Sequence, residues 1–500
     1  MKQTVFNFYD VTKSRSENIL TNFSFSHNEI CDEQERKNIE FEYQHILEET
    51  TKFNRQTVSF QANKTETLHS WIKYREGFSA QLVETLISDL GVKQGQTILD
   101  PFAGSCTTLL VAKMVGINSV GIELLPHCHL AWDAKSRVFD FNISELKDLY
   151  QQINNSVPTA PNESFPHLTI TESAFPEENE RDLMAYAQWV ENLNLSPNTR
   201  ILLKAALMSI LEDISYTRKD GQYLRWDVRA EKIVNRNKIR ISQGKKSIKG
   251  IDKGDLPKVK DILVKTLLKI IHDVQEMQNQ TPPESKHNLL KGNVLYTLPT
   301  LEENQFSAVI TSPPYANRYD YTRTYALELA FLNVGDEIFS LRQEMLSCTV
   351  ENRPKYILLE EFYASLGRPS NYHDVVKILD LTPVLKEINS ALELRNERGD
   401  INNKGVLSMI EQYFAELTFV YYELFRTCKS GAHIAFVNDN VRYAGEVIPV
   451  DLISTKLAET IGFIPVKVYV LPQRKGNSSQ QMGKFGRREL RKSITIWRKP

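Results

Sequence analysis

Short apolar segments that end abruptly alternate with longer segments of helical periodicity along this chain. Residues 306–310 form one apolar run, and residues 98–100 and 119–123 read as two further short strands. Apolar residues at helical spacing predict helices over 197–214, 256–277, 322–332 and 405–428. The last of these carries an aromatic stripe, which we interpret as core packing against a sheet. The alternation of short strands with helices indicates an open α/β sheet.

The run at 306–310 stops at Thr311-Ser312-Pro313-Pro314-Tyr315, the most informative stretch of the chain. Proline lacks a backbone donor and restricts its own backbone, so this loop is rigid and presents bare carbonyl oxygens, a hydroxyl and an aromatic ring. Open α/β sheets place their ligands at the carboxyl ends of strands. The loop suits a planar base that carries an amino group, because its oxygens can accept the N–H bonds and its ring can stack.

The strand at 98–100 leads into a turn of small residues. Asp100 closes the strand, the turn reads Pro-Phe-Ala-Gly-Ser-Cys, and residues 107–113 continue with helical character. Gly104 in this turn allows a ligand to approach the backbone closely. The strand at 119–123 ends in Glu123, where a carboxylate commonly holds the two hydroxyls of a ribose. Glu123 is therefore a candidate for ribose binding.

Asp-Pro-Phe-Ala-Gly-Ser followed far downstream by Ser-Pro-Pro-Tyr resembles the S-adenosylmethionine-dependent amino-methyltransferases of DNA, which methylate N4 of cytosine or N6 of adenine. Residues 73–82 look like the N-terminal cofactor segment of that family. Gly292-Asn293-Val294 is similar to the motif that meets the adenine of the cofactor. The resemblance covers roughly 65–145 and 285–500. It implies a doubly wound, Rossmann-like methyltransferase sheet with S-adenosyl-L-methionine as cofactor.

Two positions depart from the family pattern. The family usually has glycine where this chain has Cys106, and aspartate where it has Asn293. Cysteine is small, so we expect cofactor binding to survive. If the backbone at Cys106 needs a positive φ, however, its side chain costs on the order of 1 kcal/mol or more in strain.

The resemblance implies direct methyl transfer to a base that has left the duplex. The Ser312 hydroxyl and the Pro313 carbonyl would accept the amino hydrogens, and Tyr315 would stack on the base. Methylation of cytosine C5 is disfavoured, because it needs a Pro-Cys nucleophile and no proline precedes a cysteine here. Serine before Pro-Pro-Tyr favours cytosine N4 over adenine N6. The expected catalytic residues are Ser312, Pro313, Pro314 and Tyr315.

The same resemblance assigns the cofactor to the two turns and the segments beside them. The residues expected to bind it are Lys73, Gly77, Phe78, Asp100, Pro101, Phe102, Ala103, Gly104, Ser105, Thr107, Glu123, Asn293 and Thr311. Two other functions remain open. One is methylation of an amino group in RNA, and the other is a DNA-binding subunit whose cofactor pocket is impaired by the two departures.

The chain is longer than one catalytic domain requires. Its 500 residues, 41% hydrophobic and 25% charged, are typical of a globular chain of about three units. We expect a catalytic domain with a large, mainly helical insertion that serves as the target-recognition region, and a smaller second insertion. The boundaries are 1–64 for an N-terminal extension, 65–145, 286–332 and 405–500 for the catalytic domain, 146–285 for the target-recognition region and 333–404 for the second insertion.

Positive charge is concentrated in the target-recognition region, although the whole chain has a formal charge of −1. Residues 218–250 hold 11 lysines and arginines against three acids, which gives 11 − 3 = +8. Glycines at 221, 244 and 250 favour a loop or hairpin over a long helix. We expect double-stranded DNA to bind here through its phosphates. The residues expected to contact DNA are Arg218, Lys219, Arg225, Arg229, Arg236, Lys238, Arg240, Lys245, Lys246, Arg318 and Arg323.

Arg318 and Arg323 follow the loop at 311–315, with Asp320 between them. They would either read a base edge or phosphate, or form an ion pair that braces the loop. A second basic cluster near the carboxyl end, with a turn-rich stretch at 476–481, is equally consistent with a cover over the target strand and with a plain surface loop. Its members are Arg474, Lys475, Lys484, Arg487, Arg488, Arg491, Lys492, Arg498 and Lys499.

We expect no metal site. His127, Cys128 and His129 crowd together, but no partner cluster with zinc spacing exists elsewhere. The five cysteines are few and scattered, which favours a reducing compartment. The N-terminus lacks the features of a signal peptide, and there is no transmembrane run. We therefore expect a cytoplasmic protein of a bacterial, archaeal or phage defence system, with any cognate restriction endonuclease on a separate chain.

Overall fold

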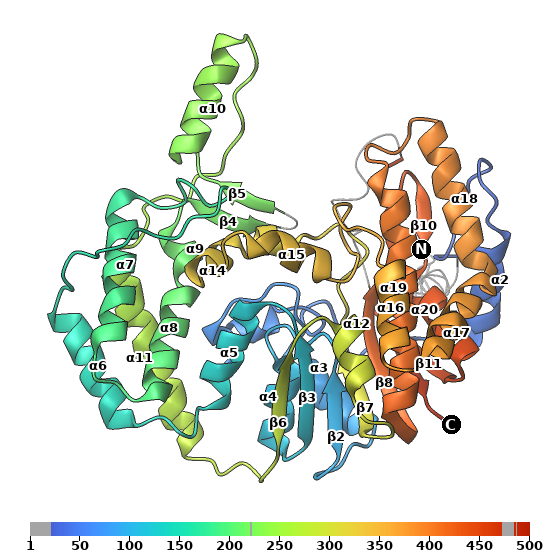
Figure 1. Cartoon of the computed structure of the whole chain (residues 1–500), viewed down its shortest axis with the longest axis horizontal. Helices are drawn as coiled ribbons and strands as arrows, with labels where there is room; N and C mark the ends of the chain where they lie inside the picture. Colours follow the sequence, from blue (N-terminus) through green and yellow to red (C-terminus); the bar gives the residue numbers. More distant parts are fainter. Residues whose placement is uncertain (1–21, 221–222, 473–484, 487) are drawn as a thin grey trace, which may run out of the picture.

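The computed structural model describes residues 22–220, 223–472, 485–486 and 488–500 (Figure 1). Its centre is an eight-stranded sheet with the order β6-β3-β2-β7-β8-β12-β11-β1. Neighbouring strands are parallel, except that β12 is antiparallel to β8 and to β11. The strands are β1 (Leu47–Glu49), β2 (Thr97–Asp100), β3 (Asn118–Glu123), β6 (His287–Lys291), β7 (Phe306–Thr311), β8 (Cys428–Asp439), β11 (Ile464–Val470) and β12 (Lys492–Arg498).

The direction in which the chain crosses the sheet reverses between β2 and β7. From β2 the chain moves outward through β3 to β6, and it then returns to the other side of β2 to form β7. Such a reversal leaves a crevice beyond the carboxyl ends of the two central strands, where open α/β sheets bind their ligands. The expected doubly wound α/β sheet is confirmed.

Helices cover both faces of the sheet because the central strands are apolar on both sides. In β7, Ala308 and Ile310 share a buried cluster with α3 (Ala80–Asp89), whereas Val309 shares one with α19 (Gly405–Thr427) on the other face. The expected helix at 405–428 is thus α19. Its aromatic stripe is buried core, as the periodicity predicted.

The chain between β3 and β6 forms a mainly helical lobe beside the sheet, on the left of Figure 1. The helix expected at 197–214 is present as α8 (Pro197–Ser209) and α9 (Leu211–Ile214), and the helix expected at 256–277 is α11 (Val259–Gln278). These helices share a large buried core with the rest of the lobe. The remaining long helices of the lobe are α5 (Pro126–Ser136), α6 (Ile143–Asn155) and α7 (Glu177–Asn192).

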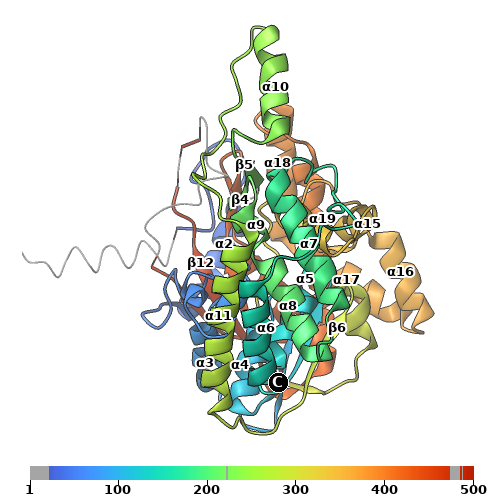
Figure 2. The same cartoon turned by 90° about the vertical axis from the view of Figure 1, so that its left-hand side faces the viewer.

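The basic segment at 218–250 is only partly the predicted loop or hairpin. β4 (Thr217–Asp220) and β5 (Tyr223–Trp226) form an antiparallel hairpin, but α10 (Glu231–Ser242) follows as a helix. Gly244 and Gly250 follow this helix and do not interrupt it, and Gly221 lies outside the described residues. α10 projects away from the body of the molecule (Figures 1 and 2), and Ile233 is its one buried residue.

The second insertion contains α15 (Glu337–Glu344), α16 (Tyr356–Ser365), α17 (Pro369–Asp380) and α18 (Pro383–Glu397). The helix expected at 322–332 precedes it in two pieces, α13 (Tyr321–Thr324) and α14 (Ala326–Phe331). No helix of the described residues is long and apolar enough to cross a membrane.

The N-terminal residues build onto the catalytic sheet. β1 forms its outer strand beside β11, and α2 (Gln34–Tyr43) packs against α18 and α20 (Val450–Ile461). The buried guanidinium of Arg36 on α2 pairs with Glu387 at 2.8 Å and with Glu446 at 3.0 Å. This buried network joins the N-terminal residues to the second insertion, a contact that no local sequence pattern indicated.

Candidate active site

The two sequence motifs meet at the crevice between β2 and β7. The hydroxyl of Thr311, at the end of β7, donates a hydrogen bond of 2.6 Å to Oδ1 of Asp100, at the end of β2. The backbone N–H of Phe102 donates to the same oxygen at 3.2 Å. Both side chains are buried, and burial raises the pKa of Asp100 to about 6. This contact ties the start of the turn at 101–105, called the glycine turn below, to the start of the loop at 311–315, called the catalytic loop.

A pocket lies at this crevice, and Gly104 of one motif and Pro314 of the other both line it. The two motifs therefore share one cleft. Of the catalytic residues expected from the sequence, Ser312 and Pro314 line the pocket. The expected cofactor residues that line it are Gly77, Phe78, Pro101, Phe102, Ala103, Gly104, Ser105, Thr107, Glu123 and Asn293.

The other expected residues lie elsewhere. Asp100 and Thr311 are buried and hydrogen-bonded to each other, so they support the pocket without lining it. Pro313 and Tyr315 are also absent from the lining. Lys73 is a correction: its side chain is 48% exposed and its ammonium pairs with Asp213 at 2.9 Å, outside the pocket.

Glu123 faces the pocket with a carboxylate that is anchored by the backbone. Its Oε2 accepts the N–H of Gly104 at 2.7 Å, and its Oε1 accepts the N–H of Leu124 at 2.9 Å and of Leu125 at 2.8 Å. Burial raises the pKa of Glu123 to about 7 despite these bonds. The carboxylate thus couples the glycine turn to the end of β3, and Oε2, which accepts a single bond, keeps a further lone pair for a ligand hydroxyl.

Cys106 adopts the left-handed backbone conformation, with φ of +62°, and begins α4 (Thr107–Val115). Cys106 therefore has the positive φ at which a side chain is strained. The side chain is fully buried and is not part of the pocket lining. The ammonium of Lys135 donates to the carbonyl oxygen of Ser105 at 3.1 Å, and burial lowers the pKa of Lys135 to about 8. This lysine braces the turn from behind.

Asn293 offers an unused donor to the pocket. Its Oδ1 accepts the backbone N–H of Leu295 at 2.9 Å and caps the short helix α12 (Val294–Thr297). Its Nδ2 is buried and has no hydrogen-bond partner among the described residues. A buried donor without a partner is costly, unless a ligand supplies an acceptor such as a ring nitrogen of adenine. The residue at this departure from the family pattern therefore fits a nucleoside in the pocket.

Sequence reasoning missed an aromatic and acidic group beside the glycine turn. Glu76 lines the pocket, and the hydroxyl of Tyr325 donates to its Oε2 at 2.5 Å. Tyr74 also lines the pocket and stacks on Tyr325, which in turn stacks on His127. Burial raises the pKa of Glu76. Tyr74 and Glu76 fall within the segment 73–82 that the resemblance singled out, so their position in that segment was the available signal.

The second insertion also reaches the pocket. Glu344, the last residue of α15, lines the pocket, as do Met345 and Leu346 after it. The sequence carried no signal for these residues, since they belong to no motif and lie more than 200 residues from the glycine turn. Only the folded chain brings them to the site.

The catalytic loop is held by its own side chains and by β8. The hydroxyl of Ser312 lies 3.1 Å from the hydroxyl of Tyr315 and 3.3 Å from the carbonyl oxygen of Val437, and it can donate to either. With its hydrogen directed to one of these oxygens, its lone pairs remain available to accept an amino hydrogen. Burial raises the pKa of Tyr315, so the phenol is neutral at ordinary pH.

Asp320 braces the chain that follows the catalytic loop. Its carboxylate caps α13 through the N–H of Arg323 and pairs with the guanidinium groups of Arg323 at 3.3 Å and Arg342 at 3.1 Å. The bracing ion pair is thus present, and Arg323 remains 40% exposed. Arg318, two residues before Asp320, has φ of +66° and a buried Nε without a hydrogen-bond partner among the described residues.

The DNA contacts expected in the basic segment differ in burial and pairing. Lys219 is a correction, because its ammonium is buried between Glu328 and Glu212 and is out of reach of a phosphate. Arg225 and Arg229 are exposed but pair with neighbouring aspartates. The basic residues on and after α10 lie on the projecting arm and are largely exposed; they are Arg236, Lys238, Arg240, Lys245 and Lys246.

The carboxyl-terminal basic cluster is only partly within the described residues. Arg474, Lys475, Lys484, Arg487 and the stretch 476–481 lie outside them. Arg491 is fully buried in a pair with Asp451 at 2.6 Å, and Lys492 pairs with Asp439. These two residues belong to the interior of the fold, so neither is part of a plain surface loop.

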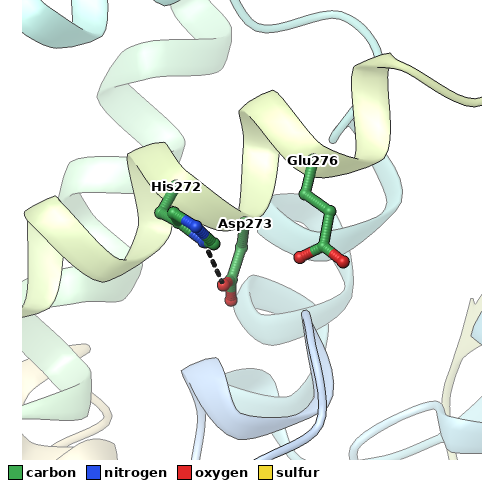
Figure 3. Close-up of side chains that lie close together, drawn as sticks. All are labelled: His272, Asp273 and Glu276. Atoms are coloured by element: carbon green, nitrogen blue, oxygen red, sulfur yellow. Dashed lines mark ion pairs between the residues drawn. The ribbon is translucent and has the colours of Figure 1, made fainter.

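Two groups of possible metal ligands have structural partners. His272, Asp273 and Glu276 lie together on α11 (Figure 3), but Oδ2 of Asp273 already accepts bonds from Trp71 Nε1 and Lys269 Nζ, each at 2.8 Å. An ammonium at that distance opposes a second cation. In the 126–129 group, His127 is buried against Tyr325, and burial lowers its pKa to about 3. His129 instead donates from Nε2 to the carbonyl oxygen of Glu123 at 2.9 Å.

Comparison with known proteins agrees with this geometry. The family described as DNA methylase, of the N6/N4 methyltransferase type, matches residues 6–131. The chain is 57% identical over 479 residues to Type II methyltransferase M.BsoBI of Geobacillus stearothermophilus, covering 95% of this chain and 94% of that protein. It is 40% identical over 456 residues to Type II methyltransferase M.AvaI of Nostoc sp. and of Anabaena variabilis, covering 89% of each chain. The chain therefore belongs to the Type II DNA methyltransferases of the N6/N4 amino-methyltransferase family.

Proposed function

We propose that this protein transfers the methyl group of S-adenosyl-L-methionine to the exocyclic amino group of a DNA base that has left the duplex, with cytosine N4 as the favoured acceptor. The observation that carries the proposal is the single pocket lined by the glycine turn and by Ser312 and Pro314. Two groups that lie more than 200 residues apart in sequence meet there, and each suits one of the two reactants.

The pocket residues fit the proposed cofactor. Glu123 would accept bonds from the ribose hydroxyls, Asn293 Nδ2 would donate to the adenine ring, and the turn at 101–105 would lie against the nucleoside. When bound, the cofactor supplies an electrophilic methyl group on a sulfonium. The impaired-subunit alternative is disfavoured, because Cys106 is not part of the pocket lining, whereas Asn293 lines the pocket and has a buried Nδ2 without a partner among the described residues.

The chain's own part in catalysis would be to position the base. The Ser312 hydroxyl and the Pro313 carbonyl would accept the two amino hydrogens, which directs the nitrogen lone pair out of the plane of the base. Tyr315 would stack on the ring of the base. A neutral serine hydroxyl in this position supports cytosine N4, while adenine N6 is the second candidate.

A basic surface beside the active site supports DNA binding. A groove runs from the root of α10 to the residues after the catalytic loop. Its lining includes the cations Lys232, Arg236, Arg323 and Arg342, the aromatic residues Trp226 and Phe339, and the two acids Glu172 and Asp336. With the exposed arm of α10, it offers cations and aromatic faces to a strand of nucleic acid. We propose residues 146–285 as the target-recognition region, within the domain boundaries expected from the sequence.

The proposed acceptor can be tested by nucleoside analysis. Plasmid DNA incubated with the protein and methyl-labelled S-adenosylmethionine is digested, and the labelled nucleosides are separated. The proposal predicts label in N4-methylcytosine. Label in N6-methyladenine would establish the second candidate, and the absence of label from DNA, despite cofactor binding by calorimetry, would overturn the proposal. Label in RNA under the same conditions tests the RNA alternative.

The biological setting is proposed from the family. A Type II methyltransferase protects the DNA of its host, so we propose a cytoplasmic protein that acts beside a restriction endonuclease on a separate chain. Sequencing of genomic DNA from an expressing host with modification-sensitive chemistry gives the base and its sequence context together. Resistance of that DNA to a co-encoded endonuclease tests the pairing.

A further inference from the structure

Lys492 and Asp439 form an ion pair next to the catalytic loop. Lys492 is the first residue of β12 and lies directly opposite Asp439, the last residue of β8, in the antiparallel register of the two strands. Lys492 Nζ and Asp439 Oδ2 are 3.4 Å apart, and the two side chains are only 16% and 18% exposed. Because β8 is the neighbour of β7, this pair lies at the same edge of the sheet as the catalytic loop.

The ammonium of Lys492 also lies over the ring of Tyr315, 5.2 Å from its centroid. A cation over an aromatic face is attracted by the negative charge of that face, most strongly where water is excluded. The hydroxyl of the same tyrosine lies 3.1 Å from Ser312 Oγ. A continuous chain of contacts therefore runs from Asp439 through Lys492 and Tyr315 to Ser312.

This chain of contacts restricts the orientations of the Tyr315 and Ser312 side chains in the catalytic loop. Lys492 lies over one face of the Tyr315 ring, so a stacked base would lie against the opposite face. A change of Tyr315 to another χ1 rotamer would break both the contact with Lys492 and the contact with Ser312. It would thus remove the stacking surface and release the serine hydroxyl that accepts the amino hydrogen.

We propose that Lys492, oriented by Asp439, is a positioning residue that holds Tyr315 and Ser312 in the geometry needed for methyl transfer. It acts through Tyr315 and does not contact a DNA phosphate. Its burial supports this role, since an ammonium that binds phosphates through water-exposed contacts has no need of a buried carboxylate partner. The inference rests on the proposed function, because it assumes that the target base stacks on Tyr315.

The first test is the kinetics of Lys492→Met, which keeps the length of the side chain and removes its charge. The rate of methylation at saturating DNA and cofactor should fall about tenfold or more, while the KM for DNA and the cofactor Kd change less than about threefold. Lys492→Arg keeps a cation beside Asp439 and over the ring, so it should restore most of the rate. A raised KM for DNA with an unchanged rate, and a smaller salt dependence, would identify a phosphate contact and overturn the proposal.

A matched control exists on the neighbouring strand. Lys467 of β11 also lies over a tyrosine ring, 5.1 Å from the centroid of Tyr469, and pairs with Glu48 at 2.7 Å. Lys467→Met removes the same kinds of contact away from the catalytic loop, so its methylation rate should stay at the wild-type value. An equal loss of rate in both variants would assign the effect to general destabilisation and overturn the positioning role.

A spectroscopic readout separates this proposal from the proposed function. DNA with 2-aminopurine at the target position fluoresces when the base leaves the stack and is quenched where it stacks on an aromatic ring. The complex with Lys492→Met should be brighter than that with the wild type, because the flipped base no longer stacks on a fixed ring. If wild type methylates DNA but the two complexes are equally bright, only the positioning role fails. If wild type methylates no amino group, the proposed function fails.

The more conservative variant Asp439→Asn guards against misfolding of Lys492→Met. It keeps the shape of the side chain and removes the charge that orients Lys492, so the rate should fall in the same direction by a smaller factor. Denaturant melts establish that each variant is folded before its kinetics are compared. An unchanged rate in a folded Asp439→Asn protein and in a folded Lys492→Met protein would overturn the proposal.

Discussion

The ring of Tyr74 lies so close to Gly104 that a Cβ on the glycine would come within 2.8 Å of Tyr74 Cε1. Gly104 also has φ of +51°, a conformation in which a side chain is strained. Two independent constraints therefore require glycine at the centre of the turn that lines the pocket. Tyr74 is itself held by stacking on Tyr325, so the ring cannot give way cheaply.

Gly104→Ala should weaken cofactor binding. The added methyl group must displace Tyr74, a member of the pocket wall, so the Kd for S-adenosylmethionine should rise about tenfold or more. Isothermal calorimetry measures this directly. The control is Gly91→Ala, because Gly91 has a similar φ of +65° but open space at the Cβ position. Equal effects of the two substitutions on the Kd would show that backbone strain, and not the clash with Tyr74, is responsible.

The strain at Cys106 can be measured by comparing two substitutions with each other. Both Cys106→Ala and Cys106→Gly remove the buried sulfur, but only glycine adopts the left-handed conformation without strain. The glycine variant should therefore be more stable than the alanine variant by about 1 kcal/mol. Urea unfolding of both proteins gives the difference. An alanine variant as stable as the glycine variant would show that the turn accommodates a side chain at no cost.

The raised pKa of Glu123 predicts that this residue makes the fold less stable as pH rises. Burial raises the pKa to about 7, above the value of 4.5 for a free glutamate, so the folded protein binds more protons than the unfolded chain between these values. Relative to Glu123→Gln, the wild type should lose about 2 kcal/mol of unfolding free energy between about pH 5.5 and pH 8 and no more above that range. Urea unfolding at several pH values tests this. A constant difference between the two proteins would place the ionisation of Glu123 outside this window.

Tyr315→Ala should reduce the methylation rate strongly and leave cofactor affinity within a few fold. Loss of stacking on one base costs about 1–3 kcal/mol, which corresponds to a factor between about 5 and 150. Tyr315→Phe keeps the ring and loses only the hydroxyl contact with Ser312, so its rate should lie between those of the wild type and the alanine variant. Single-turnover methylation separates the three proteins. Unchanged methylation by Tyr315→Ala would contradict the stacking role.

Removal of charge from the projecting arm should weaken DNA binding regardless of sequence. Lys245 and Lys246 are exposed beyond the end of α10, and their joint change to alanine should lower the affinity and reduce the salt slope by about 2. Fluorescence anisotropy at several salt concentrations measures both quantities. The control changes Lys147 and Lys265, exposed lysines on α6 and α11, and should leave the slope unaltered. An unaltered slope in the Lys245/Lys246 variant would remove the arm from the DNA contact.

Sequence reasoning located the motifs because their chemistry is local. Two prolines end a strand wherever it lies, and a small-residue turn after a strand fits a nucleoside in any open sheet. The paired motifs were therefore enough to predict the sheet, its helical insertion and most of the pocket lining. The helix α10 was missed because Gly244 and Gly250 were read as interruptions of a helix that in fact ends before them.

The positions and partners of residues outside the motifs depend on the folded chain. Lys219 belongs to a basic segment that suggested a DNA contact, yet in the β4–β5 hairpin its side chain is buried and pairs with Glu328. Lys492 belonged to a basic cluster, yet the register of β12 against β8 places it over Tyr315. Charge along a sequence does not state which face of a strand a residue occupies or what lies opposite, since both depend on pairing with distant strands.

The sequence by itself thus determined which kinds of groups this protein holds at its strand ends, and so the class of reaction it suits. The tertiary structure alone decided which side chains support those groups. Tyr325 donates a hydrogen bond to Glu76, Thr311 donates one to Asp100, and the ammonium of Lys492 lies over the ring of Tyr315. The physical reason is that strand-end chemistry follows from local backbone restriction. Support by side chains depends on long-range packing, which brings together residues that no spacing along the chain relates.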